Sequence, residues 1–140
     1  MSQENVEFVT AFFSGAAEMN KEDLLAALPE LVPQMCDPEV EWIEDPQRAD
    51  GRTYHGHAGV IDSFTRWVED FEEYGGKLEQ VRDCGDSVFV TMREEGRGRG
   101  SGATVSARLY VVMNFRKGKV LRYQEFYDET AALEAAGLSE

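Results

Sequence analysis

The sequence predicts a single α+β domain, with helices in the first half of the chain and an antiparallel sheet in the second. Two observations carry this prediction. Apolar residues recur every three or four positions up to about residue 74, which is typical of amphipathic helices. From residue 77 onward they alternate with polar residues, which is typical of strands. The length of 140 residues fits one domain, which we assign to residues 1–140.

Three amphipathic segments come before the sheet. Residues 3–19 and a segment that begins at Lys21 show helical spacing, and we expect Pro33 to end the second of them. The third and longest predicted helix runs from His57 to Tyr74, where Gly75 and Gly76 follow.

Five segments are predicted strands. The first, Glu39–Glu44, precedes a turn-rich loop that extends to Gly51. The other four follow one another and are Lys77–Arg82, Val88–Glu95, Thr104–Phe115 and Val120–Tyr127. Glycine-containing turns join these four strands, so we expect them to pair as antiparallel hairpins. A short helix, Glu129–Ala136, closes the chain.

Composition excludes several classes of protein. A hydrophobic content of 42% is enough for a core, which excludes disordered and fibrous chains. Acidic residues outnumber basic ones by 27 to 14, and the resulting net charge of −13 argues against nucleic acid or an anionic membrane as a partner. No apolar run has the roughly 18 residues of a membrane helix, and no secretory signal pattern opens the sequence. We therefore expect a cytoplasmic protein.

Neither a metal site nor a disulfide framework is indicated. Cys36 and Cys84 lie far apart, without the short Cys or His spacings of zinc sites. We expect both to be reduced thiols.

Alternation along the strands predicts which side chains face the helices. In the strand that ends at Phe115, every second residue from Val105 is apolar, so Leu109 and Val111 are predicted to face inward. The same alternation places Met92 and Glu94 on the inner face of the preceding strand. In the last strand it places Leu121, Tyr123, Glu125 and Tyr127 there.

Two acidic residues are candidates for catalysis. Glu125 is predicted to point inward among apolar neighbours, and buried carboxylates often act as general acids or bases. It is equally compatible with a structural contact, for example with Arg93. Asp45 follows the first strand and precedes Pro46, so it is either a turn residue or a functional one.

The order of four motifs resembles a known family. The motifs are the segments 40–46, 54–60, 85–88 and 118–128, with sequences VEWIEDP, YHGHAGV, GDSV and GKVLRYQEFYD. Together they resemble the SnoaL-like polyketide-cyclase branch of the nuclear-transport-factor-2-like superfamily. The resemblance implies a cystatin-like α+β barrel: a cone of curved antiparallel sheet wrapped around three N-terminal helices, open at one end to an apolar pocket. It also implies a homodimer and an activity, where there is one, that needs no metal or organic cofactor.

The resemblance suggests roles for the two acids. Asp45 is similar to the general base of the ketosteroid isomerases, but the positions of their oxyanion donors hold Phe12 and Val111, which donate no hydrogen bond. Glu125 is similar to the last-strand aspartate of the epoxide hydrolases, near whose other site positions lie Arg93 and Glu95. Cyclisation by an acid or base in an apolar chamber is a further possibility.

Two hypotheses follow. The first is a non-catalytic protein that binds a small apolar molecule. The second is a cofactor-independent isomerase, cyclase or epoxide hydrolase that uses Asp45 and Glu125 as its acid and base. For either, the predicted pocket wall comprises Trp42, Tyr54, Trp67, Phe71, Met92, Glu94, Leu109, Val111 and Tyr123.

Overall fold

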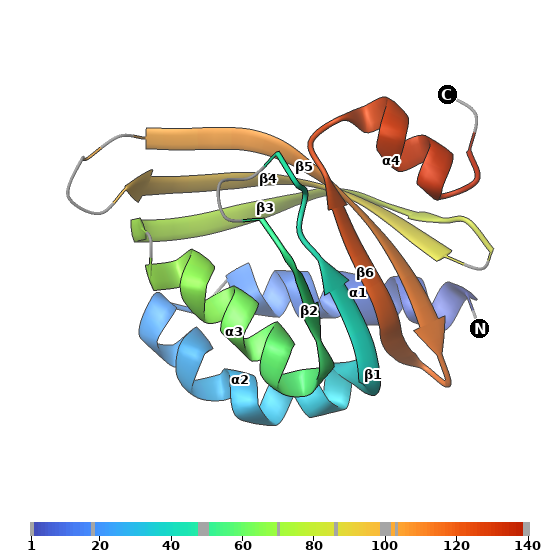
Figure 1. The fold of residues 1–140 in the computed structure, drawn as a ribbon, viewed down its shortest axis with the longest axis horizontal. Coiled ribbons are helices and arrows are strands. Elements are labelled where there is room, and N and C mark those ends of the chain that lie inside the picture. Colours follow the sequence, from blue (N-terminus) through green and yellow to red (C-terminus); the bar gives the residue numbers. More distant parts are fainter. Residues whose placement is uncertain are drawn as a thin grey trace.

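A six-stranded, curved and unclosed sheet forms the framework of the computed structural model (Figure 1). The structure describes residues 2–17, 19–47, 51–69, 71–85, 87–98, 102 and 104–138. The helices are α1 (Ser2–Ala17), α2 (Lys21–Met35), α3 (Gly56–Glu69) and α4 (Glu129–Ala135). The strands are β1 (Cys36–Ile43), β2 (Thr53–His55), β3 (Phe71–Asp83), β4 (Ser87–Gly98), β5 (Thr104–Arg116) and β6 (Lys119–Phe126). The predicted α+β class is confirmed.

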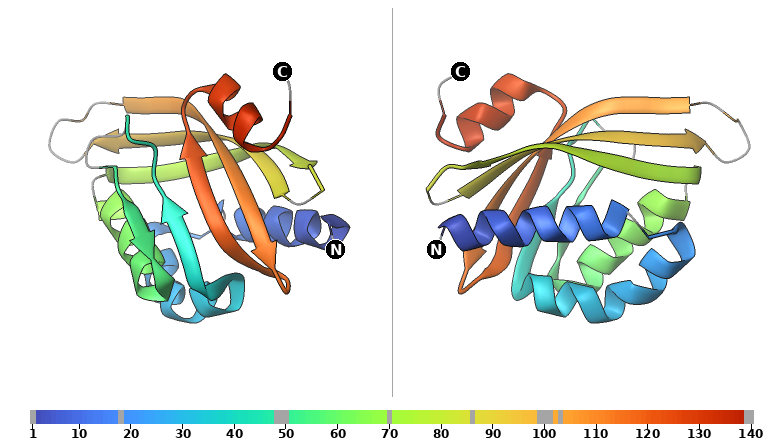
Figure 2. Two further views of the ribbon diagram at one scale, coloured as in Figure 1. Left: turned by 45° about the vertical axis from the view of Figure 1, so that its right-hand side comes forward. Right: turned by 180° about the vertical axis from the view of Figure 1, so that it is seen from behind.

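The helices lie on both faces of the sheet. Figure 2 shows α1 running along the concave face, with α2 and α3 beside it and α4 on the opposite face. The main core lies between the sheet and the first three helices, and includes Val9, Leu28, Val40, Val90 and Val111. A second cluster, made of Phe89, Tyr110, Val112 and Ala132, lies beneath α4. The predicted alternation in β5 is therefore correct, and α4 covers part of the convex face.

Strand order explains how distant segments meet. The strands are arranged β2-β1-β6-β5-β4-β3, and β3 to β6 pair as the predicted antiparallel hairpins. The pairing of β1 with β6 is parallel and sets Trp42 opposite Tyr123. Because parallel strands end at the same edge of a sheet, the residues that follow β1 lie near the end of β6. The short strand β2, which the sequence pattern missed, pairs with the outer edge of β1.

The third helix is shorter than predicted. It ends at Glu69, and the chain from Phe71 is already part of β3. The first backbone pair between β3 and β4 joins Phe71 to Gly98. Residues 71–74, for which the apolar spacing predicted helix, are therefore in the sheet. In contrast, α2 continues past Pro29 and Pro33 to Met35, because its buried ridge of leucine and valine packs on the core.

A bulge changes the inner face of β6 at its start. Phe115 pairs with Val120 and Asn114 pairs with Arg122, which leaves Leu121 as the extra residue. Val120 is therefore in the core where Leu121 was predicted. Beyond the bulge the predicted alternation holds, and Tyr123 and Glu125 are buried.

An ion-pair clamp holds the start of β1 to the end of β5. The Arg116 guanidinium donates from Nε to Asp37 Oδ2 at 3.0 Å and from Nη2 to Asp37 Oδ1 at 2.8 Å. Nη2 also donates to Glu39 at 2.9 Å. The hydrogen bonds from Arg116 hold the pKa of Asp37 below its usual range.

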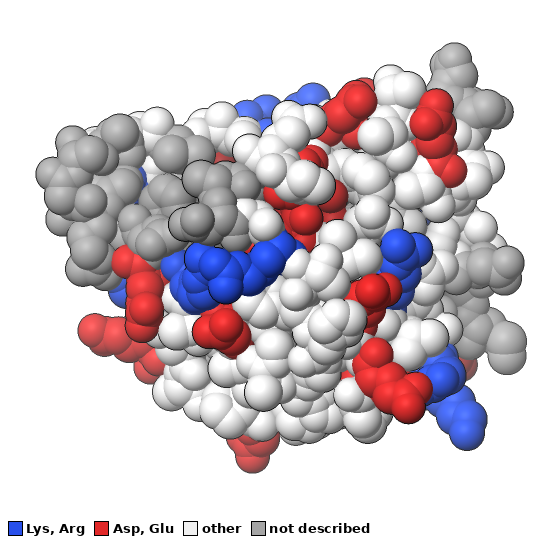
Figure 3. All heavy atoms as spheres, in the orientation of Figure 1, with Lys and Arg blue, Asp and Glu red and all other residues white. Residues whose placement is uncertain are grey.

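The surface agrees with the acidic composition. On the face drawn in Figure 3, acidic side chains are spread widely, and basic ones gather in separate groups. None of the described helices is long and apolar enough to cross a membrane. The cytoplasmic location and the homodimer remain predictions.

Candidate functional site

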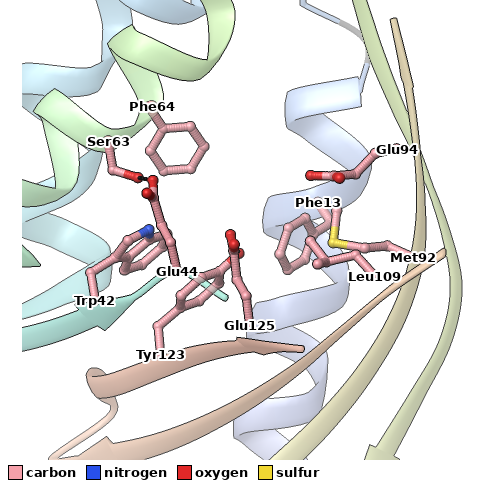
Figure 4. A pocket seen from close by; sticks show the side chains of 10 residues that line it. All are labelled: Phe13, Trp42, Glu44, Ser63, Phe64, Met92, Glu94, Leu109, Tyr123 and Glu125. Carbon is pink, nitrogen blue, oxygen red and sulfur yellow. Dashed lines mark hydrogen bonds between the residues drawn. The ribbon is translucent and has the colours of Figure 1, made fainter. Parts of the chain in front are cut away.

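A pocket opens between the concave face of the sheet and the helices α1 and α3 (Figure 4). Its cavity volume is about 60 Å³. The walls come from six strands or helices and from the residue that follows β1. The lining residues are Phe13, Trp42, Glu44, Ser63, Phe64, Met92, Glu94, Leu109, Tyr123 and Glu125.

Aromatic rings form one side of this pocket. The Trp42 and Tyr123 rings stack with centroids 3.6 Å apart and planes inclined by 2°. This stack follows directly from the parallel register of β1 and β6, which sets the two residues side by side. Phe64 from α3 packs against Trp42 at 5.6 Å. The result is a flat and rigid apolar surface.

Three buried carboxylates complete the pocket, one from the residue after β1 and the others from β4 and β6. Glu44, Glu94 and Glu125 are 7%, 8% and 8% exposed. Figure 4 shows their carboxylates directed into the same space from three sides.

Each of these carboxylates accepts a hydrogen bond from a hydroxyl group. Ser63 Oγ donates to Glu44 Oε2 at 2.6 Å. Tyr123 donates to Glu125 at 3.0 Å, and Tyr127 donates to Glu94 at 3.1 Å. These bonds fix the orientation of the three carboxylates.

Six of the eleven residues that the sequence predicted for the site line this pocket. They are Trp42, Met92, Glu94, Leu109, Tyr123 and Glu125. Arg93 and Glu95, the alternative pair on β4, lie on the other face of that strand: Arg93 contacts Glu79 at 3.6 Å, and Glu95 is exposed. The β4 alternation therefore holds to Glu94.

Three predicted residues lie elsewhere. Val111 is fully buried in the core. Tyr54 is buried on β2, and its hydroxyl accepts a hydrogen bond from Arg66. Asp45 accepts hydrogen bonds from the backbone N–H of Tyr127 at 2.7 Å and of Gln47 at 2.8 Å. The side chains of the other two, Trp67 and Phe71, lie outside the described part of the structure.

Asp45 therefore acts as a connector between strand ends. It is 5% exposed, and its two oxygens tie the turn after β1 to the residue that follows β6. It is not among the residues that line the pocket. The acid that faces the pocket at this point of the chain is its neighbour Glu44.

Sequence reasoning missed Phe13, Glu44, Ser63 and Phe64. A signal for Glu44 was present, because Val40 and Trp42 alternate on the inner face of β1 and the next inner position is residue 44. Ser63 and Phe64 follow from the packing of α3 on β1, which no local pattern shows.

Neighbouring features define what the pocket offers. No three His, Cys, Asp or Glu side chains among the described residues are placed to hold a metal ion. A second cavity of about 10 Å³ lies against α1 and shares Phe13 and Trp42 with the first. Its lining is entirely apolar. The larger pocket thus provides hydrogen-bond acceptors beside flat rings.

Comparisons with solved structures identify the fold. A protein termed a SnoaL-like polyketide cyclase from a Jannaschia species is 21% identical with a TM-score of 0.70, over 99% of this chain and 94% of that one. A protein of ketosteroid isomerase-like fold from Catenulispora acidiphila, in complex with trimethylamine, is 17% identical with a TM-score of 0.68, over 94% and 93%. TerC, crystallised with polyporic acid, is 22% identical with a TM-score of 0.68, over 96% and 98%.

A search of curated proteins found no match. The SnoaL-like domain family matches residues 8–123, which is most of the chain. The predicted resemblance is confirmed, and the chain belongs to the SnoaL-like domain family.

Proposed function

We propose that this protein binds a small organic molecule in the pocket lined by Trp42, Tyr123 and the three glutamates. Concave sites that combine a mainly apolar wall with a few fixed polar groups are the usual form of small-molecule sites. Two solved structures of the same fold hold small molecules, trimethylamine in one and polyporic acid in the other, which supports a binding role for the same cone.

One observation carries this proposal: three buried carboxylates converge on an aromatic surface in a pocket whose other lining residues, apart from Ser63, are apolar or aromatic. Removing a charged carboxylate from water costs several kcal/mol even after hydrogen bonding, so apolar residues would stabilise the domain better. Binding of a ligand explains why carboxylates that lower the stability of the domain are placed around this cavity.

The size of the cavity limits the ligand. About 60 Å³ holds a few water molecules, whereas sites for drug-sized ligands measure roughly 300 Å³ or more. A molecule of a few non-hydrogen atoms fits without rearrangement, and a larger one requires Phe13 or Met92 to move. The carboxylates also favour a ligand with polar groups over the purely apolar molecule that the sequence suggested.

Titration followed by 1H–15N NMR tests the proposal. With phenol and cyclopentanone as probes, we expect saturable shifts at the Trp42 indole N–H and at the backbone of Ser63 and Glu125. Met92→Phe fills the pocket and is expected to weaken binding by about tenfold, equivalent to about 1.4 kcal/mol. Met19→Phe, which enlarges a residue outside the pocket lining, serves as the control. Shifts that are scattered over the surface, or unchanged in Met92→Phe, would contradict binding in this pocket.

A second candidate function is proton transfer at carbon. Glu125 on β6 and Glu44, which follows β1, face one cavity. A carboxylate beside a bound ketone can remove a proton from the carbon next to the carbonyl. In this proposal Glu44 takes the place that the sequence gave to Asp45.

Deuterium exchange separates this enzyme from a binding protein. In D2O, catalysis would exchange the ring protons next to the carbonyl of cyclopentanone faster than buffer alone, and Glu125→Gln would abolish the effect. Asp45→Asn, outside the pocket, would retain it. Exchange at the buffer rate would reject proton transfer and leave the binding function standing.

A further inference from the structure

We propose that the ligand of this pocket is a small protonated amine with an oxygen atom close to its nitrogen, as in an amino alcohol. This inference rests on the proposed binding function and names the ligand class. Two neighbouring groups at the pocket wall carry it, the carboxylate of Glu44 and the indole N–H of Trp42.

Glu44 is a buried acid with only neutral partners. Its Oε2 accepts from Ser63 Oγ at 2.6 Å, and its Oε1 accepts from the backbone N–H of Arg52 at 3.3 Å. A carboxylate offers about four acceptor positions, so two remain for a ligand. A buried charge that has no oppositely charged partner is stabilised by a ligand that brings one. Glu44 therefore selects a cation.

Trp42 supplies an unused donor next to this acid. The residue is 4% exposed, and its indole N–H has no hydrogen-bond partner among the described residues. Figure 4 shows the indole nitrogen on the ring edge next to the Glu44 side chain. Buried N–H groups are nearly always satisfied, so this donor indicates an acceptor atom on whatever occupies the pocket. An oxygen of the ligand meets this requirement.

The surroundings favour an organic cation over a metal ion. No three acidic side chains of the described chain are placed to hold a metal ion. The CH2 groups of a protonated amine fit against the rings of Tyr123 and Phe64, which also attract positive charge. The net charge of −13 raises the local concentration of cations and repels anions.

Four small probes separate charge from hydrogen bonding. Ethanolamine has both the amine and the oxygen, ethylamine lacks the oxygen, ethylene glycol lacks the charge, and glycolate reverses it. The Trp42 indole resonance is a direct readout, because the chain has two tryptophans and Trp42→Phe assigns the signal. We expect ethanolamine to bind about tenfold more tightly than ethylene glycol, a ratio that corresponds to about 1.4 kcal/mol. Ethylamine should bind with a smaller shift of the indole signal, and glycolate should not bind.

Variants place the amine at Glu44. Glu44→Gln keeps the shape and removes the charge, and it should reduce the affinity for ethanolamine by about tenfold while affecting ethylene glycol little. Glu41→Gln is the matched control, since Glu41 lies three residues before Glu44, on β1, and pairs with Arg122 at the surface. The probe series on the unchanged protein gives the same test if Glu44→Gln does not fold.

The outcomes distinguish the two proposals. If ethylene glycol binds as tightly as ethanolamine, or if Glu44→Gln binds ethanolamine normally, the amine inference is wrong and the binding function stands. If neither these probes nor phenol and cyclopentanone shift the Trp42 indole signal, both proposals fail.

Discussion

Replacing Asp45 tests the structural role that the geometry gives it. Asp45→Ala removes two hydrogen bonds from backbone N–H groups, at 2.7 and 2.8 Å, to a carboxylate that is 5% exposed. Bonds to a charged group contribute about 1.5–3 kcal/mol each. Gln47 is exposed, so water can replace its bond, whereas Tyr127 is half-buried at the end of β6. We therefore expect the free energy of unfolding to fall by about 3 kcal/mol.

Urea denaturation followed by circular dichroism measures this change, and a loss of about 3 kcal/mol would also lower the Tm by about 10 °C. Asp45→Asn should lose about half as much, because its amide oxygen accepts one of the two bonds while its NH2 group faces the other donor. Asp62→Ala, an exposed aspartate on α3, is the control and should change stability by less than about 0.5 kcal/mol. An Asp45→Ala protein as stable as the control would refute the reasoning. If the Asp45→Ala protein were as stable as the control but no longer exchanged the cyclopentanone protons with D2O, Asp45 would instead be catalytic.

Three further predictions concern other parts of the molecule. The lowered pKa of Asp37 means that its ion pair stabilises the fold above the unfolded pKa, about 3.9, and that this contribution is lost as the pH falls through the lower folded value. Asp37→Asn should therefore be less stable than the unchanged protein at pH 7, and urea titrations should show the difference shrinking between about pH 5 and 2. Burial raises the pKa of the Cys36 thiol to about 12, so a thiol reagent at pH 8 should modify the half-buried Cys84 first and Cys36 only on unfolding, as peptide mass analysis would show. In Gly59→Ala the new Cβ meets the Cβ of Tyr54 at 3.0 Å, and we expect a net loss of about 1 kcal/mol in thermal unfolding because overpacking outweighs the better helix propensity.

The fold was largely predictable because its signals are local. Alternation in β4 and β5 and the turn residues between strands predicted the antiparallel half of the sheet, which the structure confirms. The sequence-based predictions were wrong where contacts between distant segments, and not the local pattern, determine the secondary structure. Phe71 fits a helical period but pairs with Gly98 in the sheet, and Leu121 is displaced by a bulge that no side-chain pattern reveals. Likewise, the parallel pairing of β1 with β6 joins segments about eighty residues apart.

The site residues that could be predicted are also those that a local pattern indicates. Glu125, Glu94 and Tyr123 lie on strands whose alternation continues to the pocket, so their direction could be inferred from sequence. The family resemblance points to Asp45 as the functional acid, whereas the alternation in β1 points to Glu44. Neighbouring side chains of a strand point to opposite faces. Only one of the two adjacent acids, Asp45 or Glu44, can therefore face the pocket.

The capacity of the pocket follows from its two shared side chains. Phe13 and Trp42 border both the acidic cavity and the smaller apolar cavity beneath α1. Trp42 is held between Tyr123 and Phe64, whereas Phe13 is a half-buried residue on a helix that packs along the concave face. Because Phe13 lines both cavities, movement of its ring would enlarge the acidic cavity toward the apolar one. A ligand larger than about 60 Å³ would then keep its polar group at Glu44 and extend its apolar part toward α1. The polar end of the pocket would thus set the chemistry of the ligand, and Phe13 would set its length.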